Sequence, residues 1–351
     1  MGTNSMRRVT GTLFIPVAVV VVLIALCSAN GVSLFNTGDS FLLLVRGVAT
    51  TMLTAMALSI NLNSGRFDFS LGAMATLSSV IGATTTLNLG GGFPMMAIVT
   101  LASGMLLGAF SGLVYVLLRI SPMVCSLGIT LLYEGISFTI TGGANVSFLL
   151  EDDLTSFAKS PINMIYVIGA ALAVMYLLFD RSRFGFEYRG LITGQAASVA
   201  AGAKEKVNAV STYAVSGVLM SMVGLILASQ MGYIEAGKLN FGTIGVMFTA
   251  FLPMFIGGYI GRFSNDKLGL LLGALCTTLI ALAMSALNAT STVQSLTNAF
   301  LLVAFLIFLS NEDRITRAWR RFTRRGGGGT SLSSSLGEPD GATSLRGANT
   351  P

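Results

Sequence analysis

The sequence lacks histidine altogether and is poor in charge. Asp, Glu, Lys and Arg make up 10% of its 351 residues, compared with about 25% in soluble domains. Without histidine, histidine-based proton relays, metal sites and catalytic triads are excluded. The Gly-x-x-x-x-Gly-Lys-Ser/Thr motif of phosphate-binding loops is also missing; no lysine follows the glycine run at 326–329. We therefore expect no catalytic residue, metal site or cofactor site, and any dependence on ATP must come from a partner.

Cysteine is scarce as well. The chain has three, Cys27, Cys125 and Cys276, and each falls inside an apolar run. Disulfide frameworks belong to oxidising compartments and small secreted domains. We therefore expect free thiols that pack like small apolar side chains.

Hydrophobic residues, by contrast, make up 53% of the chain. A helix needs about 20 apolar residues to cross a bilayer, and ten runs reach or approach that length. Membrane barrels use alternating strands of about 10 residues, and these runs do not alternate. The pattern predicts an all-α polytopic membrane protein with about ten transmembrane helices. The runs are approximately Leu13–Ala29, Phe41–Asn63, Gly72–Leu87, Pro94–Leu118, Ser121–Thr141, Ile162–Phe179, Val207–Met231, Phe241–Ile260, Leu268–Leu287 and Val293–Leu309.

The basic residues predict an orientation. If all ten runs span and the N-terminus is cytoplasmic, 18 of the 21 basic residues lie inside, and Arg46, Lys159 and Lys238 lie outside. This agrees with the positive-inside rule and puts both termini in the cytoplasm. A cleaved signal peptide is the alternative for the first run, but its removal would invert the charge pattern. No basic face suited to nucleic acid is visible.

The chain is predicted to have three parts: a cytoplasmic N-terminus over 1–12, a transmembrane domain over 13–310, and a cytoplasmic tail over 311–351. The longest inside loop covers about 180–206, and the longest outside loop runs from Gly142 to Pro161. Arg314–Arg325 is densely basic, which suits a stretch lying on anionic membrane lipid. From Gly326 onward Gly, Ser and Thr dominate, and this composition predicts disorder.

A polar turn separates the second and third apolar runs. It reads Gly65-Arg66-Phe67-Asp68-Phe69-Ser70-Leu71-Gly72. An acid between spanning segments is costly unless protein groups hold it, and such acids are commonly functional. Asp68 and Ser70 either cap the next helix or form part of a gate. Glu134, inside the fifth run, is either a buried paired carboxyl or part of a solute pathway.

A run of small residues, Gly194–Ala203, lies inside the long inner loop. Small side chains let two backbones approach closely, and flanking basic residues can steer this segment to an acidic surface. It is either an ordinary loop or a short helix that docks on a partner. Its candidate docking residues are Gly194, Gln195, Ala196, Ala197 and Gly202.

The turn is similar to the Gly-Ile-Asp-Leu-Ser-Val-Gly that permeases of bacterial sugar-type ABC importers, the ribose and monosaccharide permease family, carry after their second span. Gly65, Asp68, Ser70 and Gly72 carry the match. Further resembling stretches follow in the family's order over about residues 45–310. They are Gly112-Leu113-Val114 through Arg119-Ile120-Ser121-Pro122, Ser126-Leu127-Gly128 through Thr141-Gly142-Gly143, Arg183-Phe184-Gly185 through Gly194-Gln195-Ala196-Ala197 with Ala201-Gly202-Ala203, and Tyr213-Ala214-Val215-Ser216-Gly217 through Leu227-Ala228-Ser229.

This resemblance implies the permease subunit of a binding-protein-dependent importer in the bacterial inner membrane, with the vitamin-B12-type (type II) permease fold. It implies three partners: an ATP-binding cassette ATPase inside, a periplasmic or extracellular solute-binding protein, and a second permease in a homo- or heterodimer. The solute would be small and hydrophilic, with a monosaccharide favoured. An ion-coupled secondary transporter is the alternative, which the shortage of intramembrane acids disfavours.

The chain also departs from the family pattern. Arg66 and Phe67 replace small or aliphatic residues before Asp68, and Glu134 is an acid that the family does not require. The stretch Phe248–Gly258 contains bulky residues, namely Phe251, Pro253 and Phe255, instead of small and β-branched ones. These differences leave the identity of the solute open.

Overall fold

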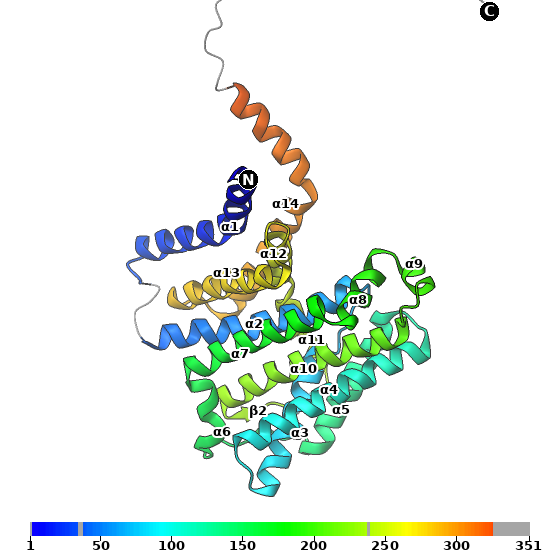
Figure 1. The fold of residues 1–351 in the computed structure, drawn as a ribbon. Coiled ribbons are helices and arrows are strands. Elements are labelled where there is room, and N and C mark those ends of the chain that lie inside the picture. The colour runs from blue at the N-terminus through cyan, green and yellow to red at the C-terminus, as the bar shows by residue number, and fades with distance from the viewer. Residues whose placement is uncertain (1, 34–37, 237–238, 326–351) are drawn as a thin grey trace, which may run out of the picture. The chain divides into compact units, whose positions relative to one another are not determined.

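A computed structural model describes residues 2–33, 38–236 and 239–325 of the chain (Figure 1). By contacts the chain divides into two units, residues 1–305 and 306–351. In the second unit the description covers only the continuation of one helix to Arg325. The disordered tail predicted from Gly326 lies outside the described residues, as do the side chains of Arg314–Arg325, so their contact with lipid stays a prediction.

Long helices build the first unit, as the apolar runs predict. The long ones are α1 Gly2–Ala29, α2 Gly38–Asn63, α3 Leu71–Leu89, α4 Phe93–Leu118, α5 Pro122–Thr141, α7 Pro161–Tyr176, α10 Glu205–Met231, α13 Asp266–Ala286 and the first part of α14 Ser291–Arg325, which continues into the second unit. Shorter pieces are α6 Asp152–Ser156, the 3-10 turn η1 Phe157–Lys159, the π-helical turn η2 Leu177–Arg181, α8 Arg183–Thr193, α9 Gln195–Ala200, α11 Ile244–Thr249 and α12 Phe251–Gly261.

Nine stretches of the described residues are helical, long and apolar enough to cross a membrane. They coincide with nine of the ten predicted runs, so the prediction of an all-α polytopic membrane protein is confirmed. The remaining run forms α3, which is a helix but falls outside these nine. Its many Ser, Thr and Gly residues make it more polar. They are tolerated because most of α3 is buried inside the bundle.

The buried core of the unit comes mainly from α2, α3 and α10, and α4 packs against α10 and α3 from one side. Glycines of α4 allow the closest approach. A Cβ at Gly108 would overlap the backbone of Tyr213 on α10, and one at Gly104 would overlap the Ser221 side chain. Small residues at four-residue spacing thus bring two long helices into backbone contact, as they commonly do in membrane bundles.

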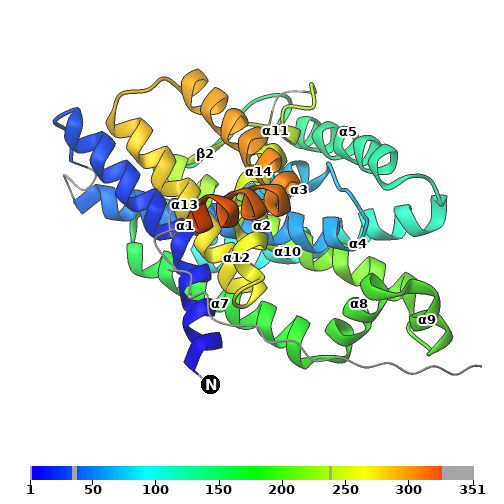
Figure 2. The ribbon, with the colours of Figure 1, turned by 90° about the horizontal axis from the view of Figure 1, so that it is seen from above.

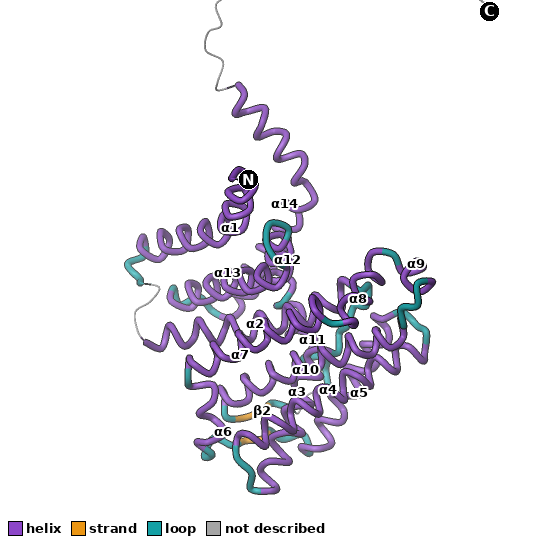
Figure 3. The backbone as a smooth tube through the Cα atoms, viewed as in Figure 1, coloured by secondary structure: helices purple, strands orange, loops and turns teal. Residues whose placement is uncertain are grey.

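Two features differ from the simple picture of uninterrupted spans. The run predicted as one helix over Phe241–Ile260 is broken at Ala250 into α11 and α12. The loop predicted outside, Gly142–Pro161, contributes strand β1 Val146–Ser147, which pairs antiparallel with β2 Tyr233–Ile234 (Figure 3). The segments α8 and α9 lie at the opposite end of the unit from this strand pair in Figure 1, and Figure 2 shows them apart from it as well.

Candidate functional site

Asp68 is completely buried in the turn between α2 and α3. Its Oδ1 accepts hydrogen bonds from the backbone N–H of Ser70 (2.9 Å) and from Ser70 Oγ (2.6 Å). Ser70 is the N-cap residue of α3, but its hydroxyl makes no capping bond to the helix. The carboxylate therefore shapes the turn before the helix, whereas the expected hydroxyl cap is absent because that hydroxyl donates to Asp68 instead.

The second oxygen of Asp68 connects the turn to two long helices. Asn61 Nδ2 at the end of α2 lies 3.4 Å from Asp68 Oδ2, and Ser216 Oγ of α10 lies 3.0 Å from Asn61 Oδ1. All three residues are buried. Through the long Asn61–Asp68 contact and the Ser216–Asn61 hydrogen bond, the turn is connected to both α2 and α10.

Glu134 is buried in α5 and accepts three hydrogen bonds from one short segment. The donors are the backbone N–H groups of Phe241 (3.1 Å) and Thr243 (3.2 Å) and the Thr243 hydroxyl (2.7 Å). Thr243 is the N-cap of α11. The carboxylate therefore holds the start of the broken helix at the positive end of its dipole. Of the two interpretations of Glu134, this geometry matches the buried, partnered carboxyl.

Gly72 brings the two carboxylate sites together. A Cβ on this residue would overlap the backbone carbonyl oxygen of Thr243, so α3 begins in direct contact with the segment that Glu134 holds. Four of the five predicted gate residues, Asp68, Ser70, Gly72 and Glu134, thus lie together around the start of α3, where the turn before it meets the start of α11. Gly65 sits at the other end of the turn with φ +72°, a conformation that glycine adopts without strain.

The phenylalanines that depart from the family pattern meet in space. Phe67 packs on Phe69 (4.7 Å between ring centroids) and on Phe251 (5.9 Å). Phe69 faces Phe248, and Phe251 stacks on Phe255. Aromatic pairs at these separations are stabilising beyond their buried area. The bulky residues of the turn and of the broken helix therefore pack against each other.

Arg66 is buried, with 7% of its surface exposed. Its side chain therefore lies inside the protein and does not extend to the lipid headgroups. It lines a polar cavity of about 230 Å³ whose walls also include Gly65, Tyr188, Gln195 and Glu205. Gln195 Nε2 donates to Glu205 Oε1 at 2.8 Å. Gly65 of the predicted gate and Gln195 of the predicted docking segment thus line the same cavity.

Tyr188 supports this end of the bundle from α8. Its hydroxyl donates to the Ile60 carbonyl at 2.7 Å, although the two residues lie 128 positions apart in the chain. Burial raises the pKa of the phenol, which keeps it protonated and able to donate. The bond fastens the loop over 180–206 to the last turn of α2, next to Asn61.

The predicted docking run is partly helical. Gln195–Ala200 forms α9, and Gln195, Ala196 and Ala197 are exposed. Gly194 precedes the helix, and Gly202 follows it with φ +94°, which ends the segment sharply. Asp180, just before α8, forms an ion pair with Lys267 Nζ of α13 (2.6 Å) and a longer one with Arg189 of α8 (3.7 Å). These ion pairs support the helix that leads into α9. The loop is therefore a supported projection with an exposed small-residue face.

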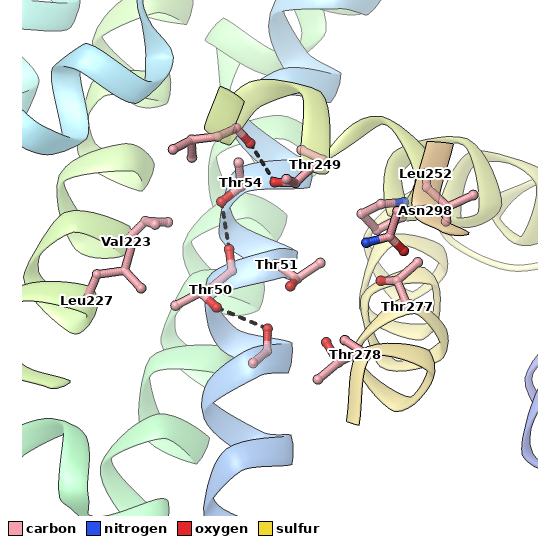
Figure 4. Close-up of a pocket in the computed structure, with 15 residues that line it drawn as sticks. Thr50, Thr51, Thr54, Val223, Leu227, Thr249, Leu252, Thr277, Thr278 and Asn298 are labelled. Carbon is pink, nitrogen blue, oxygen red and sulfur yellow. Dashed lines mark hydrogen bonds between the residues drawn. The ribbon is translucent and has the colours of Figure 1, made fainter. Parts of the chain in front are cut away.

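A larger cavity, of about 430 Å³, lies between α2, α10, α13 and the break between α11 and α12. Figure 4 shows threonines of α2 facing Thr277 and Thr278 of α13. The Thr278 hydroxyl is buried without a hydrogen-bond partner among the described residues. Thr54 and Thr249 donate to carbonyls of their own helices, so their oxygens keep free acceptor capacity. Thr50, Thr51 and Asn298 add further polar groups.

This cavity was not predicted from sequence. The available signal was the recurrence of threonines on two apolar runs, Thr50, Thr51 and Thr54 on one and Thr277 and Thr278 on the other. Asn61 and Ser216 were missed as well. They are isolated polar residues within long apolar runs, and such residues commonly face the interior of a bundle.

Comparison with known proteins agrees with this architecture. Residues 40–309 match the family model described as "Branched-chain amino acid transport system / permease component". The galactofuranose transporter permease protein of Escherichia coli is 25% identical over 238 residues, covering 66% of this chain and 67% of that protein. The autoinducer 2 import system permease protein of Photorhabdus luminescens is 26% identical over 282 residues, covering 78% and 80%.

A third similar protein is the autoinducer 2 import system permease protein of Yersinia enterocolitica, 27% identical over 206 residues, or 57% of this chain and 54% of that protein. No solved structure matches the chain. The family model extends from the first turn of α2 through the apolar part of α14 and includes every element of the site described above. The chain belongs to this family of transport-system permease components.

Proposed function

We propose that the chain is the transmembrane subunit of an ATP-driven importer for a small neutral polyol, most simply a monosaccharide, in the bacterial inner membrane. The observation that carries the proposal is the family match over 40–309. It is supported by likeness to permeases that are named for galactofuranose and autoinducer 2. The substrate, the partners and the orientation are inferences from that membership and from the geometry below.

The threonine-lined cavity supports a neutral, hydroxyl-rich solute. No charged side chain is among the described residues that line it. Its volume of about 430 Å³ lies within the range of roughly 300–1,000 Å³ typical of small-molecule sites. Threonine oxygens accept hydrogen bonds and the unpartnered Thr278 hydroxyl can donate one, which matches a sugar better than it matches an ion or a charged amino acid.

The buried acids argue against the rival, an ion-coupled secondary transporter. Asp68 and Glu134 are the buried acids of the described bundle, and protein N–H and O–H groups already surround both. A coupling site for a proton or cation needs an acid that is available to that ion. Both carboxylates instead hold helices in place.

The exposed α9 segment supports an ATPase partner. Gln195, Ala196 and Ala197 present small side chains on a braced projection, and the Gln195–Glu205 hydrogen bond connects it to the first residue of α10. Movement of α9 would thereby reach the 230 Å³ cavity, which is also lined by Gly65 and Arg66 of the turn between α2 and α3. A solute-binding protein would act at the opposite end of the unit, and a second permease, identical or different, would complete the pathway.

Uptake of labelled solutes tests the proposal. A strain that lacks this chain should lose ATP-dependent uptake of at least one neutral sugar and should regain it with the wild-type chain. The purified chain alone should hydrolyse no ATP. Uptake restricted to a charged amino acid would contradict the substrate class. Uptake that persists without ATP but collapses with the ion gradient would support the secondary transporter instead.

Topology is tested separately. Reporter fusions at residue 351 and in the Gly142–Pro161 loop should report opposite sides of the membrane, with the former cytoplasmic, because 18 of 21 basic residues fall on one side of the predicted ten-span arrangement. If both fusions reported the same side, the arrangement of spans would be wrong.

A further inference from the structure

Two adjoining cavities at the α8–α9 end of the unit share three residues, Arg66, Tyr115 and Glu205. The first is the 230 Å³ cavity that Gly65 and Gln195 line. The second, of about 260 Å³, opens between the end of α4 and the start of α10, and Arg119 and Lys206 add to its wall. Neither cavity has a role in the solute pathway proposed above.

The charges around the two cavities are unbalanced. Arg66, Arg119 and Lys206 contribute three positive charges from three different elements, and Glu205 is the single acid among the lining residues. The Glu205 carboxylate already accepts a hydrogen bond from Gln195. The pocket therefore retains an excess of positive charge.

Arg66 is the inner cation of this group. Its side chain lines both cavities and it is 7% exposed, yet no hydrogen bond or ion pair reaches its guanidinium from the part of the chain that the structure describes. A buried charge without a partner is costly. The planar guanidinium also matches a phosphate group in a two-point contact, so an anion entering the cavity would relieve this cost.

The surroundings favour the same ligand. Lys206 lies in the first turn of the 27-residue helix α10, where the helix dipole and free amides attract anions. Arg119 is the C-cap of α4 and is exposed at the rim, with φ 55°. Tyr115 adds a hydroxyl that can donate.

We propose that these two cavities form a binding site for a phosphate group, with Arg66 as the inner ligand and Arg119 and Lys206 at the rim. The phosphate can come from a phospholipid headgroup or from a free phosphate compound. Because Gln195 of α9 lines the first cavity together with Arg66, an occupied site would stiffen the contact between α9 and the turn between α2 and α3.

The test uses the full-length purified chain in two kinds of nanodisc. In pure phosphatidylcholine discs, inorganic phosphate is titrated and the thermal midpoint is followed. In discs that contain phosphatidylglycerol, retained lipid is counted by native mass spectrometry. The main variant is Arg119→Gln with Lys206→Gln at the exposed rim. The control is Arg181→Gln with Arg183→Gln, which removes the same charge from exposed positions outside the two cavities.

We expect the rim variant to weaken binding of the phosphate group by about tenfold or more, the usual scale for loss of charge-assisted hydrogen bonds, and the control to leave it unchanged. Protection by inorganic phosphate identifies a free ligand, whereas selective retention of phosphatidylglycerol identifies a lipid headgroup. Arg66→Gln should abolish binding where the variant folds. The proposal is overturned if neither probe binds the wild type, or if the rim and control variants behave alike.

Discussion

The two buried carboxylates, Asp68 and Glu134, hold neighbouring segments in different ways: Asp68 holds the turn before α3, and Glu134 holds the start of α11. Asp68 works locally, bonding Ser70 two residues away and Asn61 seven residues away. Glu134 works over a long range, bonding Phe241 and Thr243, which lie 107 and 109 residues further along the chain. One acid shapes a turn and the other fastens two distant segments together.

This difference explains why only one of them could be interpreted from sequence. Local hydrogen bonds between an acid and the residues just after it follow from turn chemistry, and the Asp68–Ser70 spacing shows them. Nothing in the residues around Glu134 points to Thr243. The difference also predicts unequal costs of substitution, since a lost long-range bond releases a whole segment, whereas a lost local bond loosens one turn.

Replacing Glu134 should have the largest effect. Glu134→Ala leaves two backbone N–H groups and the Thr243 hydroxyl without their acceptor, and we expect a loss of about 3 kcal/mol in the free energy of unfolding. Thermal denaturation in detergent measures it. Glu151→Ala, at an exposed acid, is the matched control and should change stability by less than about 0.5 kcal/mol. Equal midpoints for the two variants would contradict the assigned role of Glu134.

Gly72→Ala should have the next largest effect. The added methyl group would overlap the Thr243 carbonyl, and overpacking of this kind costs about 1–3 kcal/mol. Gly128→Ala is the control, because a Cβ there meets no atom within 4 Å. Denaturation curves and uptake should both distinguish the two variants. A Gly72→Ala protein as stable and active as Gly128→Ala would show that α3 and α11 are not in contact.

Asp68→Asn should cost less stability, about 1 kcal/mol. The amide keeps one acceptor oxygen for Ser70, but its N–H₂ group then faces Asn61 Nδ2, a second donor. Because the network also reaches α10 through Ser216, we expect uptake to fall more than the amount of folded protein in the membrane. Normal uptake at normal expression would reduce Asp68 to an ordinary turn residue.

Thr278→Val should have the smallest effect on stability, within about 0.5 kcal/mol, because its buried hydroxyl has no hydrogen-bond partner among the described residues. Polar groups that hold the fold are bonded, as at Glu134, whereas this one is available to a solute. Uptake of the sugar should therefore fall although the protein is equally stable. Wild-type uptake would exclude the threonine-lined cavity as the solute path.

Hydropathy predicts the long helices well because burial in lipid requires continuous apolar runs. The composition of the loop also indicates where α9 lies, since a run of small residues between basic residues marks this segment. The break at Ala250, the pairing of β1 with β2 and the bond from Tyr188 to Ile60 depend on packing between segments far apart in the chain. The joint departure of Phe67 and Phe251 from the family pattern was visible in the sequence, but their contact became clear only in three dimensions.

The most direct test of the proposed coupling through α9 is ATP-driven uptake by Ala197→Trp in proteoliposomes that contain the partner ATPase and the binding protein. Ala197 is exposed, so the bulky ring should leave the thermal midpoint unchanged but block close approach of the partner. Ala102→Trp, at an exposed position of α4 away from both docking ends, is the control and should transport normally. We predict at least a tenfold loss of uptake for Ala197→Trp alone; wild-type uptake by that variant would contradict coupling through α9.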